Sequence, residues 1–415
     1  MSENQVILIG FQLVDDLVFE YEILELEELA KVCGLETIKV FAQKGDKAHP
    51  HSYFGSGKLI ELKELIEELE VKTIVCNDEL SPAQQEHLQE ALGCQIIDRT
   101  MLILEIFSQK AHTKEAKLQV EISALQYALP RLRGSFVGLS RQGGGYGFRN
   151  RGSGETKLEL SRRLVERRVA TCKEELKELV LQRQTQRKQR QNSTIKSVAV
   201  VGYTNAGKST LINSLVSSKD KEVFVKDQLF ATLETRVRQV ELAQHFHCLI
   251  SDTVGFVDKL PHQLIKAFRS TLEEIKEVDL LLHVIDISNP YHSKQEAITL
   301  KVLSEIGVEN IPLINVYNKI DKTELDYKAG ENKIFLSAIN NQGIDLLKQM
   351  IIDKLYLDYE TVQFLFPYTM TSQVSEIRNY YATLGYNEIE TGIEIAVLIP
   401  KMLKEKYKDY LINKS

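Results

Sequence analysis

The sequence predicts an α/β protein in which two parallel βαβ sheets are joined by an antiparallel pair of helices and followed by a small α+β part. Three observations lead to this fold class. Short β-branched runs alternate with amphipathic helical runs over the first hundred residues, the alternation returns from Ile195, and two helical runs between these regions enclose a glycine-rich stretch. Strands separated by helices are typical of parallel sheets. We expect four parts, at residues 1–112, 113–192, 195–358 and 359–415.

Composition excludes several classes of protein. The chain is 43% hydrophobic and 27% charged, as in globular proteins. No apolar stretch is long enough to span a membrane, and the N-terminus lacks a basic and then apolar signal. The five cysteines form no C-x-x-C pair and have no histidine partner at metal spacing. We therefore expect no membrane span, no secretory signal and a reducing, cytoplasmic location.

The first part is predicted to be a parallel sheet covered by helices. Ser81 followed by Pro82 is a typical helix start, and Gly34 and Gly93 follow helical runs as stop signals. The predicted strands are 6–11, 37–41, 73–78 and 95–98, and the predicted helices are 21–34, 59–70 and 81–93.

The segment Phe54-Gly55-Ser56-Gly57-Lys58 looks like a shortened phosphate loop. It lacks the first glycine at the needed spacing, and Leu59 stands where a Mg²⁺-binding hydroxyl is required. We expect a turn into the following helix, with a nucleotide site as the alternative. The histidine pairs His49/His51 and His245/His247 have no partners at ligand spacing, so we expect no metal there.

The second part is predicted to be an antiparallel helical hairpin. Apolar residues recur at steps of three and four between residues 113 and 129 and again from Leu158 onward, as on one face of a helix. Eight of the 22 glycines lie within residues 134–154, where no helical period is present. We expect a Gly/Arg loop at the tip of the hairpin and a polar linker after the second helix, at about 182–194.

This second part differs in charge from the rest of the chain. Residues 131–168 contain ten basic and three acidic residues, a net charge of +7, whereas the whole chain carries −6 and the remainder therefore −13. Nucleic-acid partners are predicted from such local regions rather than from the average. A basic, glycine-rich loop suits RNA phosphates. The alternative is a solvated loop that binds nothing.

The third part carries a phosphate-binding motif. The pattern G-x-x-x-x-G-K-S runs from Gly202 to Ser209, directly after an apolar strand and before a helix. In such a loop the backbone N–H groups surround phosphates, Lys208 reaches the β and γ oxygens, and the Ser209 hydroxyl binds Mg²⁺. A glycine-rich turn with a surface lysine is the alternative.

The predicted strands of this part are 197–202, 236–242, 246–252, 280–286, 311–318 and 333–338, and 236–242 and 246–252 are predicted to be antiparallel. Helices are predicted after Lys208, after about Pro261 and after Tyr291, and a last helix is predicted to run through Leu355.

Two further motifs follow at strand ends. Asp252-Thr253-Val254-Gly255 fits D-x-x-G, with Asp252 near Mg²⁺ and the Gly255 N–H near the γ-phosphate. Asn318-Lys319-Ile320-Asp321 ends in a carboxylate that can accept both hydrogens of guanine's donor pair. Adenine has no such pair, so the motif predicts GTP rather than ATP. Ser337-Ala338 can present backbone to the guanine carbonyl. No chemical motif is present in the fourth part.

With these motifs in place, the chain resembles the HflX GTPases of the Obg–HflX group over nearly its whole length. The stretches that carry the resemblance are GSGETKLELSRR (152–163), DQLFATLE (227–234) and DTVGFVDKLPHQLIKAFRSTLEE (252–274). The resemblance implies GTP hydrolysis, binding to the 50S subunit, splitting of stalled 70S ribosomes, and insertion of the hairpin loop toward the peptidyl-transferase centre of 23S rRNA. It also implies that Thr232 of switch I contacts Mg²⁺ and the γ-phosphate.

The candidate residues follow from the motifs and the resemblance together. The catalytic candidates are Lys208, Thr232 and Gly255, and the Mg²⁺ ligands are Ser209 and Thr232, with Asp252 acting through water. The nucleotide-binding candidates are Gly202, Tyr203, Thr204, Asn205, Ala206, Gly207, Lys208, Ser209, Thr210, Phe230, Ala231, Thr232, Leu233, Glu234, Asp252, Thr253, Val254, Gly255, Asn318, Lys319, Ile320, Asp321, Ser337, Ala338 and Ile339. The rRNA-binding candidates are Arg141, Arg149, Arg151, Arg162 and Arg163.

Two stretches depart from the family pattern. Phe148-Arg149-Asn150-Arg151 lies between the glycine run and G-S-G-E, where the family carries G-P-G-E, and it lengthens the tip. A longer tip would reach further into the region where antibiotics bind, which predicts a resistance-type variant. Glu234-Thr235-Arg236 stands where many members carry Asp-Pro-Thr, so the placement of switch I differs from theirs.

Two residues bear on the rate of hydrolysis. Phe256 occupies the position at which many small GTPases carry a water-orienting glutamine. Slow hydrolysis alone and stimulation by the ribosome are therefore expected. Asn205 lies where some GTPases hold K⁺, so K⁺ is a second candidate ion. We expect a monomer. An rRNA-remodelling or subunit-assembly GTPase is the main alternative, and a purely regulatory switch would leave the +7 region unexplained.

Overall fold

The computed structural model describes residues 4–14, 18–132, 154–190, 195–216, 236–244, 246–259, 273–308, 310–324 and 328–412. The chain divides into two compact units. The first comprises residues 1–181, 227–233 and 257–270, and the second comprises residues 182–226, 234–256 and 271–415.

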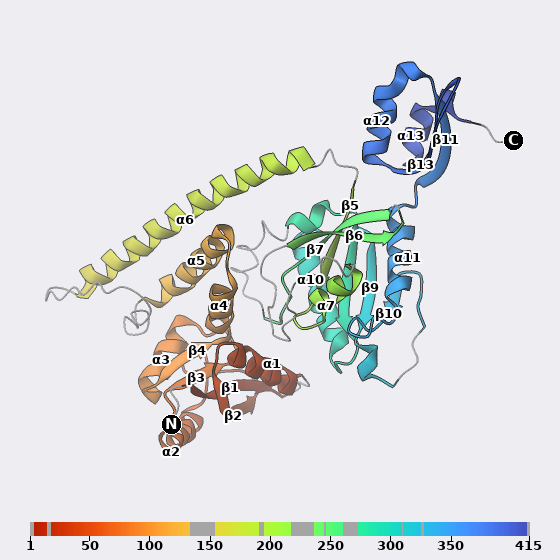
Figure 1. Ribbon diagram of the computed structural model, residues 1–415. Coiled ribbons are helices and arrows are strands. Elements are labelled where there is room, and N and C mark those ends of the chain that lie inside the picture. The colour runs from red at the N-terminus through yellow and green to blue at the C-terminus, as the bar shows by residue number, and fades with distance from the viewer. Residues whose placement is uncertain are drawn as a thin grey trace. The chain divides into compact units, whose positions relative to one another are not determined.

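The first unit contains a four-stranded sheet with the order β2-β1-β3-β4, in which every neighbouring pair is parallel (Figure 1). Its strands are β1 (Gln5–Leu13), β2 (Glu36–Gly45), β3 (Thr73–Cys76) and β4 (Gln95–Asp98). The helices between and after them are α1 (Phe19–Val32), α2 (Ser56–Leu69), α3 (Pro82–Leu92) and α4 (Arg99–Lys110). The predicted parallel sheet is confirmed, and Ile7, Ile74 and Ile96 are fully buried between strand and helix side chains.

The ends of the helices follow the sequence signals. The Ser81 hydroxyl accepts a hydrogen bond from the Gln84 N–H, the Gln84 side chain accepts one from the Ser81 N–H, and Gly93 ends α3 with φ +67°. Such a cap stabilises a helix by about 1 kcal/mol. The Phe54–Lys58 segment forms the predicted turn, because Gly55 is the N-cap of α2 and the Lys58 ammonium pairs with Glu61.

A pair of helices follows the sheet. These are α5 (Lys114–Ala128), continued by the 3-10 turn η1 (Leu129–Arg131), and α6 (Gly154–Arg190). Leu118 and Ile122 pack against Cys172. Ion pairs join Lys114 to Glu175 and Glu121 to Arg168. Because the earlier residue of α5 pairs with the later residue of α6, the helices are antiparallel, as predicted.

The predicted linker after this pair is wrong for residues 182–190. Helix α6 continues through them to Arg190. The stretch is rich in Gln, Arg and Lys and contains no Gly or Pro. These residues are good helix formers, so a polar composition did not end the helix.

The second unit contains a six-stranded sheet with the order β10-β9-β8-β5-β7-β6. All neighbours are parallel except β6 and β7, which form the predicted antiparallel ribbon. The strands are β5 (Lys196–Gly202), β6 (Arg236–Ala243), β7 (Phe246–Asp252), β8 (Leu280–Asp286), β9 (Leu313–Asn318) and β10 (Lys333–Phe335). The helices are α7 (Lys208–Leu215), α10 (His292–Glu305) and α11 (Ile344–Leu355), with 3-10 turns η2 (Glu273–Glu277) and η3 (Ile320–Lys322). The helix predicted from about Pro261 lies outside the described residues.

The chain ends in a small α+β part with its own core. Its antiparallel sheet has the order β11-β13-β12. The elements are β11 (Tyr359–Phe366), η4 (Tyr368–Met370), α12 (Thr371–Tyr380), β12 (Ala382–Ile389), β13 (Gly392–Pro400), α13 (Lys401–Lys406) and η5 (Lys408–Tyr410). Phe364, Ile395 and Val397 are fully buried there. Among the described helices of the whole chain, none has the length and apolar character needed to cross a bilayer.

Candidate functional site

The phosphate-loop motif lies between β5 and α7, at the carboxyl edge of the six-stranded sheet. Glycine is required at both ends of the loop. A Cβ on Gly202 would lie 2.3 Å from the backbone oxygen of Val284, and one on Gly207 would lie 2.3 Å from the side-chain nitrogen of Asn318. Gly207 also has φ +92°, which disfavours other residues. The loop is thus fitted closely around the neighbouring strand ends.

Lys208 is folded into the loop. Its Nζ donates to the carbonyl oxygens of Gly202 (3.1 Å) and Tyr203 (2.7 Å). The side chain is buried, and desolvation lowers the pKa of Lys208 to about 8 against the raising effect of Asp252. The ammonium is therefore positioned where an anion could replace the two carbonyl oxygens as its partner.

Ser209 and Asp252 lie in direct contact. The Ser209 hydroxyl donates to Asp252 Oδ2 at 2.8 Å. Mg²⁺ prefers oxygen ligands and keeps several waters and substrate phosphates in its shell, and a hydroxyl beside a carboxylate fits that preference. In the described part of the chain, no three His, Cys, Asp or Glu side chains converge on a point. A magnesium ion here would thus depend on phosphate and water as well as on these two side chains.

The D-x-x-G motif lies directly against the phosphate loop. A Cβ on Gly255 would lie 3.0 Å from Lys208 Nζ. The next residue, Phe256, donates its N–H to Gly202 O at 3.1 Å and accepts from the Thr204 N–H at 2.7 Å. The Phe256 side chain is almost fully buried. An aromatic ring that cannot hydrogen-bond water therefore occupies the glutamine position.

The N-K-x-D motif completes the site from the end of β9. Asn318 Nδ2 donates to Ala206 O at 3.0 Å, and its Oδ1 accepts from the Ala338 N–H at 3.0 Å. Asn318 thereby joins the phosphate loop to the Ser337–Ala338 segment. Ser337 Oγ donates to Asp321 Oδ1 at 2.5 Å, and Asp321 is exposed. Its carboxylate is thus oriented but accessible, as a base-binding group must be.

Asp286 is a site residue that the sequence analysis missed. It ends β8, and its Oδ2 accepts from Lys319 Nζ at 2.7 Å. The same Nζ donates to Asn205 O at 2.7 Å. Asp286 therefore holds the N-K-x-D lysine over the phosphate loop. The signal was present, because Asp286 follows an apolar strand as Asp252 and Asn318 do.

A second missed contact involves the segment that follows Gly255. Lys259 belongs to the first unit, and its Nζ donates to Glu22 Oε2 and Asp78 Oδ1, both at 2.7 Å. Burial acts to lower the pKa of Lys259, but the two carboxylates outweigh it and the pKa is raised. Nothing in the local sequence indicated this pairing, because Glu22 and Asp78 lie far away along the chain.

Part of the predicted site lies outside the described residues. This is true of Phe230, Ala231, Thr232, Leu233 and Glu234, and of Arg141, Arg149 and Arg151. Arg162 and Arg163 are described on α6. Both are exposed, and Arg162 donates to Glu166 at 2.9 Å. Thr210, Thr253 and Ile339 lie beside motif residues, and the Thr253 hydroxyl donates to Val200 O at 2.7 Å.

Three family models match the chain. They are described as "GTP-binding GTPase N-terminal" (residues 20–108), "GTP-binding GTPase Middle Region" (110–190) and "50S ribosome-binding GTPase" (197–319). The GTPase HflX of Caldanaerobacter subterraneus is 43% identical, over 94% of this chain and 90% of its own length. That of Escherichia coli is 37% identical, over 85% of this chain and 83% of its own. A crystal structure of a GTP-binding protein from Sulfolobus solfataricus with GDP is 24% identical, covers 84% of this chain and 98% of its own, and has a TM-score of 0.44.

The class of the protein follows from the fold and the site. A phosphate loop, a D-x-x-G motif and an N-K-x-D motif meet at the carboxyl edge of one parallel sheet, which is where doubly wound folds bind ligands. This arrangement is that of a P-loop GTPase, an enzyme that hydrolyses GTP. The chain is 35–44% identical to several GTPases HflX over most of its length. The protein therefore belongs to the HflX family of GTPases.

Proposed function

We propose that the protein binds the 50S subunit in its GTP-bound form and splits stalled 70S ribosomes. The observation that supports this most directly is the match of residues 197–319 to a "50S ribosome-binding GTPase" family. The +7 region of residues 131–168 adds support, because it joins α5 to α6 and supplies the positive charge that rRNA phosphates require. We propose that it is directed at 23S rRNA near the peptidyl-transferase centre, through Arg141, Arg149, Arg151, Arg162 and Arg163.

The nucleotide roles that we propose follow the geometry of the second unit. The loop from Gly202 to Thr210 surrounds the phosphates, and Lys208 exchanges its carbonyl partners for β and γ oxygens. Asp321 accepts from guanine, with Ser337 orienting its carboxylate. The backbone of Ser337, Ala338 and Ile339 faces the guanine carbonyl. Residues 230–234, Thr253 and Val254 complete the pocket.

We further propose that Mg²⁺ is held by Ser209 and Thr232, with Asp252 acting through a water. When bound, the ion would neutralise charge on the phosphates. The chain's own contribution is to hold the Ser209 hydroxyl against Asp252, as it does at 2.8 Å, and to bring the Gly255 N–H toward the γ-phosphate beside Lys208.

The buried Phe256 ring supports slow hydrolysis in the absence of the ribosome. It provides no amide to orient the attacking water. We expect the 50S subunit to raise the rate of GTP hydrolysis strongly, and equal rates with and without 50S would contradict this.

We also propose that Asn205 contributes to a potassium site. Exchanging K⁺ for Na⁺ in the same hydrolysis assay tests this, and equal rates in the two salts would exclude the site.

The decisive experiment is light scattering of 70S ribosomes mixed with the protein and a non-hydrolysable GTP analogue. Splitting predicts a fall in scattering that GDP does not produce. The alternative, an rRNA-remodelling or large-subunit assembly GTPase, predicts unchanged scattering of mature 70S and activity on immature subunits only. Lys208→Met serves as the control, because it removes the ammonium that the phosphates require.

The longer tip supports a second, narrower proposal. The residues Phe148–Arg151 stand between the glycine run and G-S-G-E. We propose that this added length lets the loop reach the region of the ribosome where antibiotics act, so that the protein protects ribosomes from such drugs. Deleting Asn150 and Arg151 should abolish protection and spare GTP hydrolysis. Unchanged protection in a translation assay would disprove the proposal.

The remaining proposals concern organisation. We propose that residues 1–112, 113–192, 195–358 and 359–415 act as an N-terminal α/β domain, a helical hairpin, the GTPase domain and a C-terminal domain. We also propose that the protein is a monomer and acts in the cytoplasm, where ribosomes are found. Light scattering of the purified chain tests the monomeric state, and a dimeric mass would contradict it. Cell fractionation tests the cytoplasmic location.

A further inference from the structure

A polar cluster lies where the sheet of the first unit meets α5, and its central group is Asp98. Asp98 ends β4, and its carboxylate is fully buried. Its oxygens accept from the N–H groups of Leu80 (3.0 Å) and Met101 (2.9 Å) and from the Tyr127 hydroxyl. Burial raises the pKa of Asp98 although these hydrogen bonds oppose it. The three donors thus fix the carboxylate and bring the end of α5 to β4.

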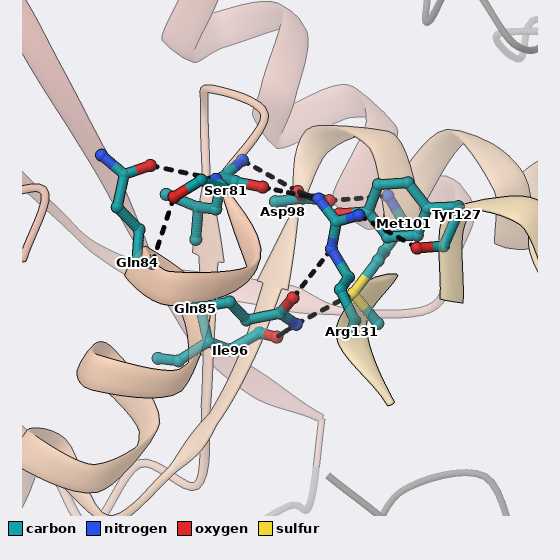
Figure 2. A network of polar contacts seen from close by, with 9 residues as sticks. Ser81, Gln84, Gln85, Ile96, Asp98, Met101, Tyr127 and Arg131 are labelled. Atoms are coloured by element: carbon teal, nitrogen blue, oxygen red, sulfur yellow. Dashed lines mark hydrogen bonds and ion pairs between the residues drawn. The ribbon is translucent and has the colours of Figure 1, made fainter. Parts of the chain in front are cut away.

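Arg131 closes this cluster. Its Nη2 donates to Leu80 O (2.5 Å), its Nε to Gln85 Oε1 (3.1 Å) and its Nη1 to Tyr127 O (3.0 Å). The guanidinium lies 3.5 Å over the Tyr127 ring and 3.9 Å from Asp98 Oδ2. Figure 2 shows the guanidinium turned toward Asp98 and Gln85, between α3, β4 and α5. Each of the three guanidinium nitrogens therefore donates to an acceptor within the protein.

The position of Arg131 in the chain makes this arrangement significant. Arg131 ends η1 and is the first of the ten basic residues in the region 131–168. In the sequence, the basic residues from Arg133 to Arg151 follow η1 directly and precede α6. Arg131 therefore fixes the backbone at the end of η1, where the chain passes from α5 to the basic segment.

Helix α6, which follows the basic segment, is also held by contacts within the first unit. Arg168 of α6 donates through Nε (2.6 Å) and Nη2 (2.8 Å) to the two carboxylate oxygens of Glu121 on α5. Four residues after Arg168, Cys172 packs against Leu118 and Ile122 of α5. Helices α5 and α6 are thus joined to each other, while the Asp98 cluster joins α5 to the sheet.

Stability alone does not account for the choice of residues. A buried ion pair costs desolvation and is often no more stabilising than apolar side chains of similar volume. What a bidentate or forked arginine adds is a defined geometry, because its planar donors satisfy several acceptors in only one orientation. Here the fork joins the α3 region, through Leu80 and Gln85, to the end of α5 at Tyr127.

We propose that Arg131 is a positioning residue that sets the direction in which the chain leaves η1 for the basic segment, by holding the end of α5 to the N-terminal sheet. This inference rests on the proposed binding of that segment to rRNA. The N-terminal sheet thereby acts as the support from which the basic segment extends, through the Asp98 cluster. Arg131 is also removed from the charges available to RNA, although it belongs to the basic region by sequence.

The test is GTP hydrolysis at increasing concentrations of 50S subunits with Arg131→Met and Arg131→Lys. Misdirecting a binding segment weakens productive contact, so we expect about a tenfold rise in the KM for 50S, with kcat and the 50S-free rate unchanged. Arg131→Lys should be as impaired as Arg131→Met, because the three hydrogens of an ammonium radiate from one nitrogen and cannot reach the three acceptors that the separate guanidinium nitrogens serve. Arg378→Met is the matched control, since Arg378 also lies over a tyrosine ring, Tyr386, at 4.3 Å in the C-terminal part.

Salt dependence separates positioning from direct rRNA contact. A residue that touches a phosphate changes the slope of log affinity against log salt by about one when it is neutralised. Arg131→Met should leave that slope unchanged. If Arg131→Lys restores the KM, or if the slope of Arg131→Met falls, Arg131 acts by its charge and the inference is wrong.

Two further outcomes keep the test clear. If 50S does not stimulate the unaltered protein, the proposed function fails; if it does and both Arg131 variants match the unaltered protein, only the present inference fails. Should Arg131→Met not fold, Gln85→Met removes the side-chain acceptor of Arg131 Nε and keeps Arg131 itself. It should raise the KM by about threefold, as expected for the loss of one hydrogen bond, and an unchanged KM would overturn the inference.

Discussion

Lys208 shows how single residues of the site are tuned. Its ammonium is buried against two carbonyl oxygens, and desolvation lowers its pKa to about 8. Below pH 8 the lysine is charged in the folded and the unfolded chain. Between pH 8 and the ordinary value of 10.5 the folded chain loses this proton first, so this group makes the nucleotide-free protein more stable as pH rises through that window. Bound phosphates have the opposite effect on the pKa of Lys208 and raise it, because they favour the charged ammonium.

GTP binding should therefore take up a proton at alkaline pH. We expect uptake of about 0.1 proton at pH 7 and about 0.9 at pH 9, with affinity falling as pH rises through 8. Calorimetry in two buffers of different ionisation enthalpy measures this uptake. The buried His283 does not interfere, because burial lowers its pKa to about 4. Equal uptake at pH 7 and pH 9 would show that Lys208 does not change its charge.

At the scale of elements, the site depends on strand ends that approach each other closely. Gly207 is the N-cap of α7 and lies against Asn318, the last residue of β9. Asp286 at the end of β8 holds Lys319. The parallel strands β5, β7, β8, β9 and β10 thus each end in a short polar segment at the same edge, and these segments support one another.

Gly207→Ala should abolish measurable GTP binding. The new Cβ would lie 2.3 Å from Asn318 Nδ2, so either the loop or the asparagine must move. Equilibrium binding of a fluorescent GTP analogue tests this. Gly34→Ala is the matched control, because Gly34 has a similar φ of +76° but nothing within 4 Å of the added Cβ. It should cost about 1 kcal/mol of stability and leave binding unchanged; if both variants bind alike, steric contact is not the cause.

At the scale of the whole molecule, charge is divided between regions. The net −6 hides a +7 region, and the structure shows that this region is not uniformly available to a partner. Arg131 points into the Asp98 cluster, and Arg168 makes a two-fold contact with Glu121. Binding to rRNA would therefore depend on fewer charges than the sequence count indicates, and the tip arginines would contribute most.

Neutralising Arg141, Arg149 and Arg151 together should reduce the salt dependence of 50S binding. Each phosphate contact contributes about 0.7 to 0.9 to the slope of log affinity against log salt, so the triple Arg→Gln variant should lower the slope by about 2 to 3. Sedimentation with 50S subunits at several salt concentrations measures it. Lys58→Gln is the control, since that lysine pairs with Glu61 in the N-terminal part. Equal slopes for the triple variant and the unaltered protein would disprove the rRNA contact.

Much of the fold was predictable because its signals are local. The strands and helices of both sheets follow from periodicity and from caps such as Ser81 and Gly93. The prediction failed at residues 182–190, where polar composition indicated a linker but helix-forming side chains continue α6. The motifs of the proposed nucleotide site could be located for a similar reason, since the phosphate loop, D-x-x-G and N-K-x-D are each one short segment at the end of a strand.

The sequence by itself determined the GTPase motifs, their order and the basic character of the region between α5 and α6. Only the tertiary structure decided which distant groups meet. Asp286 holds Lys319, Lys259 pairs with Glu22 and Asp78, and Arg131 turns inward to Leu80. The physical reason is that short motifs act through their own backbone and spacing, whereas a charge finds its partner through packing of elements far apart in the chain. Thus Arg131, basic by sequence, became a structural support by its position.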